Sequence, residues 1–147
     1  MGKKLLIVLA LISAMMLLSA SLCREYNEES GRKGTDILLN SNWSVINKHS
    51  ESDLVWPWTV VFSESSTGGV IDINITQTLY GSKTIYGTGW LDDDSLEFHF
   101  HLRDANDPGW SAELVIPVTS ITSSNFSGHL DVKNSGAHFI TRGTVDK

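Results

Sequence analysis

Apolar and polar residues alternate with a period of two along most of the chain from Ile37 onward, and this pattern restricts the fold to β-structure. Ile71, Ile73 and Ile75 share one face of their run, and Phe98 and Phe100 share one face of the run 96–102. Successive side chains of a strand project to opposite faces, so each run predicts a half-buried strand. Further runs lie at 110–118, 126–132 and 139–145, and less regular ones at 43–48, 58–62 and 84–91.

Turn-forming residues separate the runs, for example at 66–69, 92–94, 107–109 and 135–136. The pattern predicts an all-β fold of about eight antiparallel strands in sequential order. Because hairpin order is easily connected and closure removes exposed edges, an up-and-down barrel is favoured, with a two-sheet β-sandwich as the alternative. A two-residue turn at Ser135–Gly136 would pair Val132 with Phe139 and Lys133 with His138.

Three features resemble the small bacterial lipocalin-like barrels of the calycin group. They are Trp43 in the first strand, the series of hairpins, and the late Phe126-Ser127-Gly128 followed by a closing strand. The resemblance covers about Asn40 to Asp146, and Ser41 stands where the lipocalin Gly-x-Trp pattern has glycine.

The resemblance implies a barrel that holds a small, largely apolar molecule in its interior. The expected lining is Trp43, Trp58, Phe62, Ile73, Trp90, Phe98, Phe100, Trp110 and Phe139. In the alternative interpretation these side chains only fill the core, because an eight-stranded barrel is just wide enough for packed side chains or one small ligand.

The N-terminus has the layout of a secretory signal peptide over residues 1–23. Lys3 and Lys4 precede an apolar stretch from 5 to 18, and small residues follow at 19–21. Cleavage after Ser21 or after Cys23 fits this layout, and the protein is then secreted or periplasmic. Alternatively, Cys23 carries the lipid anchor of an outer-surface lipoprotein. The apolar stretch is shorter than the roughly 20 residues of a membrane-spanning helix, so no membrane span is expected.

Residues 24–35 contain no aliphatic side chain and predict a flexible tether, which leaves 36–147 as the β-barrel domain. The chain has 11 basic and 17 acidic residues, and loss of Lys3 and Lys4 would deepen the negative balance. This charge argues against nucleic acid as a partner. With one cysteine, the chain cannot form an intrachain disulfide.

His99 and His101 lie two residues apart and therefore project from the same face of their strand. Together with Glu97 they are candidate ligands of a metal ion. However, Phe98 and Phe100 occupy the opposite, apolar face, so the sequence favours two solvent-facing histidines of no special role.

Five tryptophans in a short chain point to a second class of function, a protein- or carbohydrate-binding module of the cell exterior. Trp56 and Trp58 share a face and could form an exposed aromatic platform. A third class, an enzyme, receives no support from motifs: the sequence has no glycine-rich phosphate loop, G-x-S-x-G or H-E-x-x-H. We therefore expect a non-catalytic binding protein without a cofactor.

Overall fold

The computed structural model describes residues 2–77 and 82–146 of the chain, with side chains from residue 12 onward. A long helix, α1 (Gly2–Leu39), precedes eight strands, and a short 3₁₀ helix, η1 (Val118–Ser120), separates the sixth strand from the seventh. The strands are β1 (Asn42–His49), β2 (Val55–Glu64), β3 (Ile71–Gln77), β4 (Lys83–Asp92), β5 (Glu97–Asp104), β6 (Ser111–Pro117), β7 (Asn125–Val132) and β8 (His138–Val145).

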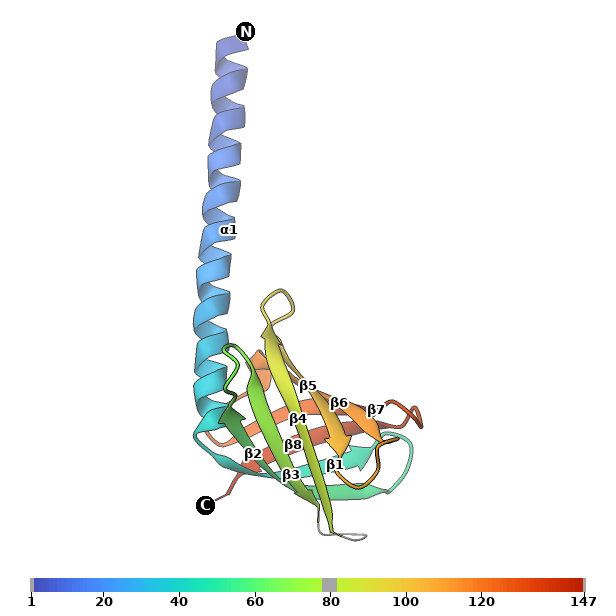
Figure 1. Cartoon of the computed structure of the whole chain (residues 1–147). Coiled ribbons are helices and arrows are strands. Elements are labelled where there is room, and N and C mark those ends of the chain that lie inside the picture. The colour runs from blue at the N-terminus through green and yellow to red at the C-terminus, as the bar shows by residue number, and fades with distance from the viewer. Residues whose placement is uncertain (1, 78–81, 147) are drawn as a thin grey trace.

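The strands form one closed antiparallel barrel in sequence order (Figure 1). Each strand pairs with the next, and β1 also pairs with β8, where Trp43 lies opposite Val145 and His49 opposite Phe139. Because the sheet closes on itself, it has no edge strand. The predicted up-and-down, lipocalin-like barrel is confirmed, and the sandwich alternative is excluded.

Burial follows the alternation of the sequence. In β3, Ile71, Ile73 and Ile75 are buried, while Asn74 and Thr76, which alternate with them, are exposed. The inward side chains fill the barrel, with ring centroids 5.1 Å apart for Phe62 and Phe100, 6.3 Å for Phe62 and Phe126, and 4.9 Å for Trp43 and Phe126. The interior is therefore a packed aromatic and aliphatic core.

Two glycines make room for this core. Gly89 lies opposite Phe100, and Gly143 lies opposite Phe126 in the neighbouring strand. A Cβ atom added at either glycine would overlap the facing phenyl ring. A glycine under an aromatic ring lets a strand bend sharply while the ring covers its backbone, a device that curved sheets and barrels require.

The β7–β8 register differs from the prediction. Phe139 pairs with Leu130, and His138 pairs with Asp131. The connection is longer than two residues, since the Val132 N–H donates to the Ala137 carbonyl and the Gly136 N–H donates to the Val132 carbonyl. The predicted register is thus wrong by two residues, but a shift of two keeps every side chain on its face, so the core is unchanged.

The segment 24–35 was expected to be a flexible tether and is instead part of α1. The helix crosses one end of the barrel, where Gly31, Gly34 and Leu38 are buried. The side chains nearest to the two glycines are Leu91 and Phe98, and the Trp43 indole N–H donates to the Leu38 carbonyl at 3.2 Å. The expectation is wrong because glycine is common both in flexible linkers and at positions of close packing. The sequence alone does not show the side chains against which Gly31 and Gly34 pack.

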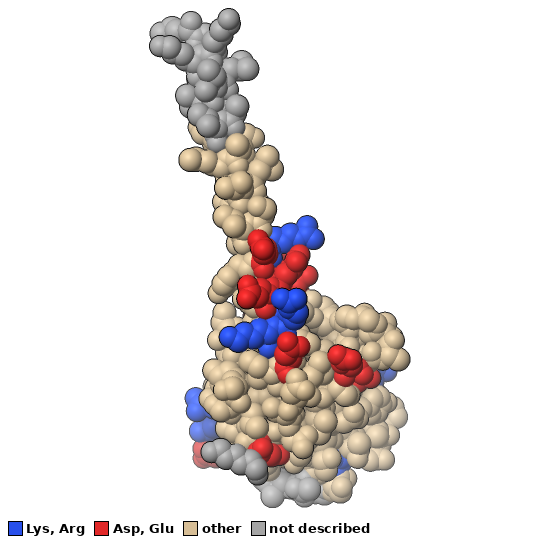
Figure 2. Space-filling model, turned by 90° about the vertical axis from the view of Figure 1, so that its left-hand side faces the viewer, with Lys and Arg blue, Asp and Glu red and all other residues tan. Residues whose placement is uncertain are grey.

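The rest of α1 extends beyond the barrel (Figure 1). The large apolar side chains of residues 12–22, such as Met15 and Leu17, are exposed. Figure 2 shows the charged side chains of α1 gathered where the helix approaches the barrel, below an uncharged stretch. Within the residues searched, the structure contains no helix with the length and apolarity needed to cross a membrane.

The glycine–phenylalanine pairs lead to a stability prediction. Replacing Gly143 by alanine should lower the free energy of unfolding by about 1–3 kcal/mol, since the new methyl group overlaps Phe126 and overpacks the core. This exceeds the gain of about 0.4–1 kcal/mol that alanine brings through lower chain entropy in the unfolded state. Gly68→Ala, at an open surface position, is the control and should not destabilise the protein in urea unfolding. Equal effects of the two changes would contradict this account.

Candidate functional site

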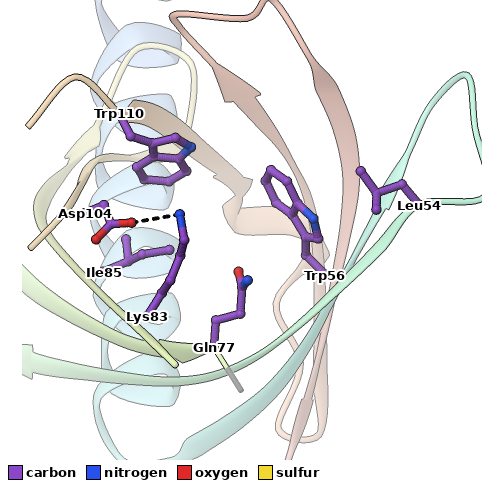
Figure 3. Close-up of a pocket in the computed structure, with 7 residues that line it drawn as sticks. All are labelled: Leu54, Trp56, Gln77, Lys83, Ile85, Asp104 and Trp110. Carbon is purple, nitrogen blue, oxygen red and sulfur yellow. Dashed lines mark ion pairs between the residues drawn. The ribbon is translucent and has the colours of Figure 1, made fainter. Parts of the chain in front are cut away.

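The two ends of the barrel differ. The end where β1 begins is covered by α1, with Leu38 fully buried. The opposite end, reached by the last residues of β1, β3, β5 and β7, contains a pocket of about 220 Å³. We call this the mouth pocket. Its lining is Leu54, Trp56, Gln77, Lys83, Ile85, Asp104 and Trp110 (Figure 3).

The walls of the mouth pocket are mainly apolar. Trp56, at the start of β2, and Trp110, just before β6, present their indole rings to it (Figure 3). Trp56 also stacks on Phe139, with ring centroids 4.4 Å apart and an interplanar angle of 27°. Since Phe139 is fully buried in β8, this stacking fixes the Trp56 ring relative to the core.

One ion pair lies in the pocket. The Lys83 ammonium is 3.1 Å from Oδ2 of Asp104, whose side chain is 1% exposed. The other carboxylate oxygen of Asp104 accepts the backbone N–H of Asn106 at 2.9 Å. The Asn106 N–H, followed by the Lys83 ammonium, lowers the pKa of Asp104 below its ordinary value although burial opposes this. The Asp104 carboxyl is therefore ionised at neutral pH.

The polar side chains beneath the pocket bond to one another. The Trp58 indole N–H donates to the Gln77 side-chain oxygen at 3.0 Å. Thr141 donates to the Asn47 side-chain oxygen at 2.7 Å, and the Asn47 amide donates to the Trp56 carbonyl at 3.2 Å. Within the described residues, no buried side-chain nitrogen or oxygen lacks a partner. These bonds satisfy the buried polar side chains at this end of the barrel.

The structure places the nine predicted lining residues in three environments. Seven are buried in the core and pack against one another: Trp43, Trp58, Phe62, Ile73, Phe98, Phe100 and Phe139. Trp110 is partly buried and lines the mouth pocket. Trp90 is 44% exposed on the outer face of β4 and does not line the interior. The prediction for Trp90 is wrong because two inward positions of β4 are glycines, Gly87 and Gly89. Glycine has no side chain, so the sequence shows no apolar residue there that would identify the inward face.

The prediction missed most of the pocket. Leu54, Gln77, Lys83, Ile85 and Asp104 were not identified as lining residues, and Trp56 was assigned to an exposed platform with Trp58. Both of these tryptophans point into the barrel, so they form no such platform. Their shared face was visible in the sequence, but only the closed barrel shows that this face is the inner one.

His99 and His101 lie on the outer face of β5, as the alternation predicted. Trp90 stacks beside them, with ring centroids 5.0 Å from His101 and 6.2 Å from His99. Glu97 Oε2 is 3.7 Å from the Nε2 of His99. In the part of the chain that was searched, no three His, Cys, Asp or Glu side chains are arranged to hold a metal ion.

Glu113, in β6, joins this outer face to Lys133, which directly follows β7. It lies 3.1 Å from the Nδ1 of His99 and accepts a bond from the Lys133 ammonium at 2.6 Å. Lys133 first, and then His99, lowers the pKa of the Glu113 carboxyl to about 2. The carboxylate therefore links β5 and β6 with the residue that follows β7.

Comparisons with known proteins support the fold. A redesigned β-barrel, mFAP1, whose structure was solved bound to DFHBI, is similar to this chain with a TM-score of 0.56 and 19% sequence identity. The match covers 75% of this chain and 95% of mFAP1. No protein-family model and no curated protein matches the sequence.

The lowered pKa of Glu113 predicts how stability depends on acid. Because its pKa in the folded protein lies near 2, below the ordinary value of 4.5, its contribution is complete above about pH 4.5 and is lost as the pH falls toward 2. Glu113→Gln should flatten the pH dependence of the unfolding free energy in this window. Glu51→Gln, in the exposed connection after β1, should leave it unchanged. Parallel curves for the wild type and Glu113→Gln would contradict the assignment.

Proposed function

We propose that this protein is an exported, non-catalytic binding protein that holds one small, largely apolar molecule in the mouth pocket. The observation that carries the proposal is the pocket itself, in which Trp56 and Trp110 provide aromatic walls around about 220 Å³. A concave, mostly apolar site with a few converging polar groups is the usual form of a small-molecule site.

The packed core favours the mouth of the barrel as the binding site. Rings such as Phe62, Phe100 and Phe126 occupy the middle of the barrel, so the ligand lies at the mouth instead of in the centre. A cavity of about 150 Å³ accommodates benzene, and drug-sized molecules occupy roughly 300–1,000 Å³. A pocket of about 220 Å³ therefore suits a single ring with small substituents better than a long acyl chain.

Two further observations support binding over catalysis. The similar barrel mFAP1 was solved bound to DFHBI, so a barrel of this fold can hold a small molecule. In the mouth pocket, Asp104 is paired with Lys83 and its pKa is lowered. A general acid or base works best with a pKa near the operating pH, and Asp104 is shifted away from it.

The alternative function, recognition of a protein or a carbohydrate, has support on the outer face. Trp90 is 44% exposed and stacks beside His99 and His101. An exposed planar aromatic group of this kind could contact a sugar ring or a partner's side chain. This surface and the mouth pocket use different tryptophans, so single substitutions separate the two functions.

Export is supported by the independence of the signal segment from the barrel. The large apolar side chains of residues 12–22 are exposed, whereas the buried residues of α1, Gly31, Gly34 and Leu38, follow the proposed cleavage region. Cleavage near Ser21 or Cys23 would remove the apolar segment and retain the part of α1 that covers the barrel.

The binding proposal predicts distinct effects of two tryptophan substitutions. In a titration with acetophenone, a one-ring probe, the indole N–H signals of Trp56 and Trp110 should shift in NMR spectra. Trp110→Ala should weaken binding by about tenfold or more, because it removes one aromatic wall. Trp90→Ala is the matched control and should leave the affinity unchanged. Loss of binding in Trp90→Ala but not in Trp110→Ala would instead favour the outer face.

Intact-mass measurement of the exported protein tests the N-terminus. We expect a mature chain that begins between Leu22 and Arg24, because Ser19, Ser21 and Cys23 provide the small residues that cleavage requires. A diacylglycerol attached to Cys23 would identify the lipoprotein form. An exported chain that retains Met1 would contradict the signal-peptide assignment.

A further inference from the structure

The mouth pocket carries a hydrogen-bond donor as well as apolar walls. We infer that it selects an uncharged ring compound with one hydrogen-bond acceptor, such as a ketone, and that the Lys83 ammonium donates to this acceptor. This inference rests on the proposed function and specifies the chemical class of the ligand.

The Lys83 ammonium has more N–H donors than its pairing with Asp104 uses. A lysine ammonium has three N–H groups and no acceptor. Within the described part of the chain, Asp104 is its hydrogen-bonding and ion-pair partner, at 3.1 Å. The Lys83 side chain is 42% exposed, whereas that of Asp104 is 1% exposed, so the ammonium is the accessible member of the pair.

The position of the ammonium matches this role. Figure 3 shows the end of the Lys83 side chain beneath the indole ring of Trp110 and beside Asp104, with Trp56 across the open space of the pocket. A flat ring lying in this space would contact both apolar walls. An acceptor on its edge would meet the ammonium, and such a charge-assisted hydrogen bond is stronger than one between neutral groups.

The charge balance of the pocket decides against an ionic ligand. Lys83 and Asp104 are the two charged residues among the seven that line it, and their charges cancel. An anion would lose its hydration and lie near the buried Asp104 carboxylate, and a cation would lie near the Lys83 ammonium. A neutral acceptor uses the free donors of Lys83 without either cost.

The experiment compares four one-ring probes of similar size by isothermal titration calorimetry with the full chain. They are ethylbenzene without an acceptor, acetophenone with a neutral acceptor, benzoate with an anionic one, and benzylamine with a cation. Acetophenone should bind about tenfold tighter than ethylbenzene, the difference expected for one hydrogen bond from a charged donor. Benzoate and benzylamine should bind more weakly than acetophenone.

The control is a double variant that removes the donor without leaving a buried charge unpaired. Lys83→Met with Asp104→Asn retains the length of the lysine stem and an oxygen for the Asn106 N–H. In this variant acetophenone and ethylbenzene should bind equally. Lys83→Arg, a single change that keeps a charged donor beside Asp104, should preserve the preference and serves as the check if the double variant does not fold.

The outcomes separate this inference from the proposed function. Equal affinities for acetophenone and ethylbenzene in the wild type, or a preference that persists in the double variant, would overturn the role of Lys83 and leave the pocket as a binding site. Tighter binding of benzoate or benzylamine would overturn the choice of a neutral ligand. If no probe bound, both the proposed function and this inference would fail.

Discussion

The ladder between β1 and β8 is the constraint on which the other features of this protein depend. It joins the first strand to the last, with Trp43 opposite Val145 and His49 opposite Phe139, and closes the sheet. Without it the inner faces of all eight strands would not meet around one axis. Closure also sets the diameter: an eight-stranded barrel has an interior that side chains can just fill. The packed core and the site at one end both follow from this geometry.

Because the centre is filled, the space inside the barrel lies where the packing ends. At one end α1 contributes Leu38 to the core, and the Trp43 indole bonds to the helix backbone. At the other end the inward positions change from aliphatic and aromatic to polar, with Asn47, Gln77 and Asp104 all buried. Each has a partner of its own, Thr141 for Asn47, Trp58 for Gln77 and Lys83 for Asp104, and these bonds let polar groups remain inside the barrel. The mouth pocket is the space above this polar layer, and its aromatic walls are extensions of the core, as the stacking of Trp56 on Phe139 shows.

The inner and outer faces use the same types of residue for different purposes. The acidic side chain of Asp104 lies inside, paired with Lys83, while Glu113 lies outside, between His99 and Lys133. Both carboxyl groups have a lowered pKa because hydrogen bonds favour their charged form. Tryptophan divides in the same way: Trp43 and Trp58 are core, Trp56 and Trp110 form the pocket, and Trp90 is on the surface. The type of a residue alone therefore does not reveal its role here.

The sequence by itself determined the all-β class, the sequential order of the strands and the inward face of most of them, because the period of two is a local property of the strand backbone. It also identified His99 and His101 as outward residues. Only the tertiary structure decided the remainder. Gly31 and Gly34 are tightly packed helix positions since their neighbours, Leu91 and Phe98, lie far along the chain. Lys83 is the first residue of β4 and Asp104 the last residue of β5, and antiparallel pairing brings them together. Trp56 and Trp110 stand 54 residues apart. Contacts at such separations depend on how the barrel closes, which no local pattern encodes.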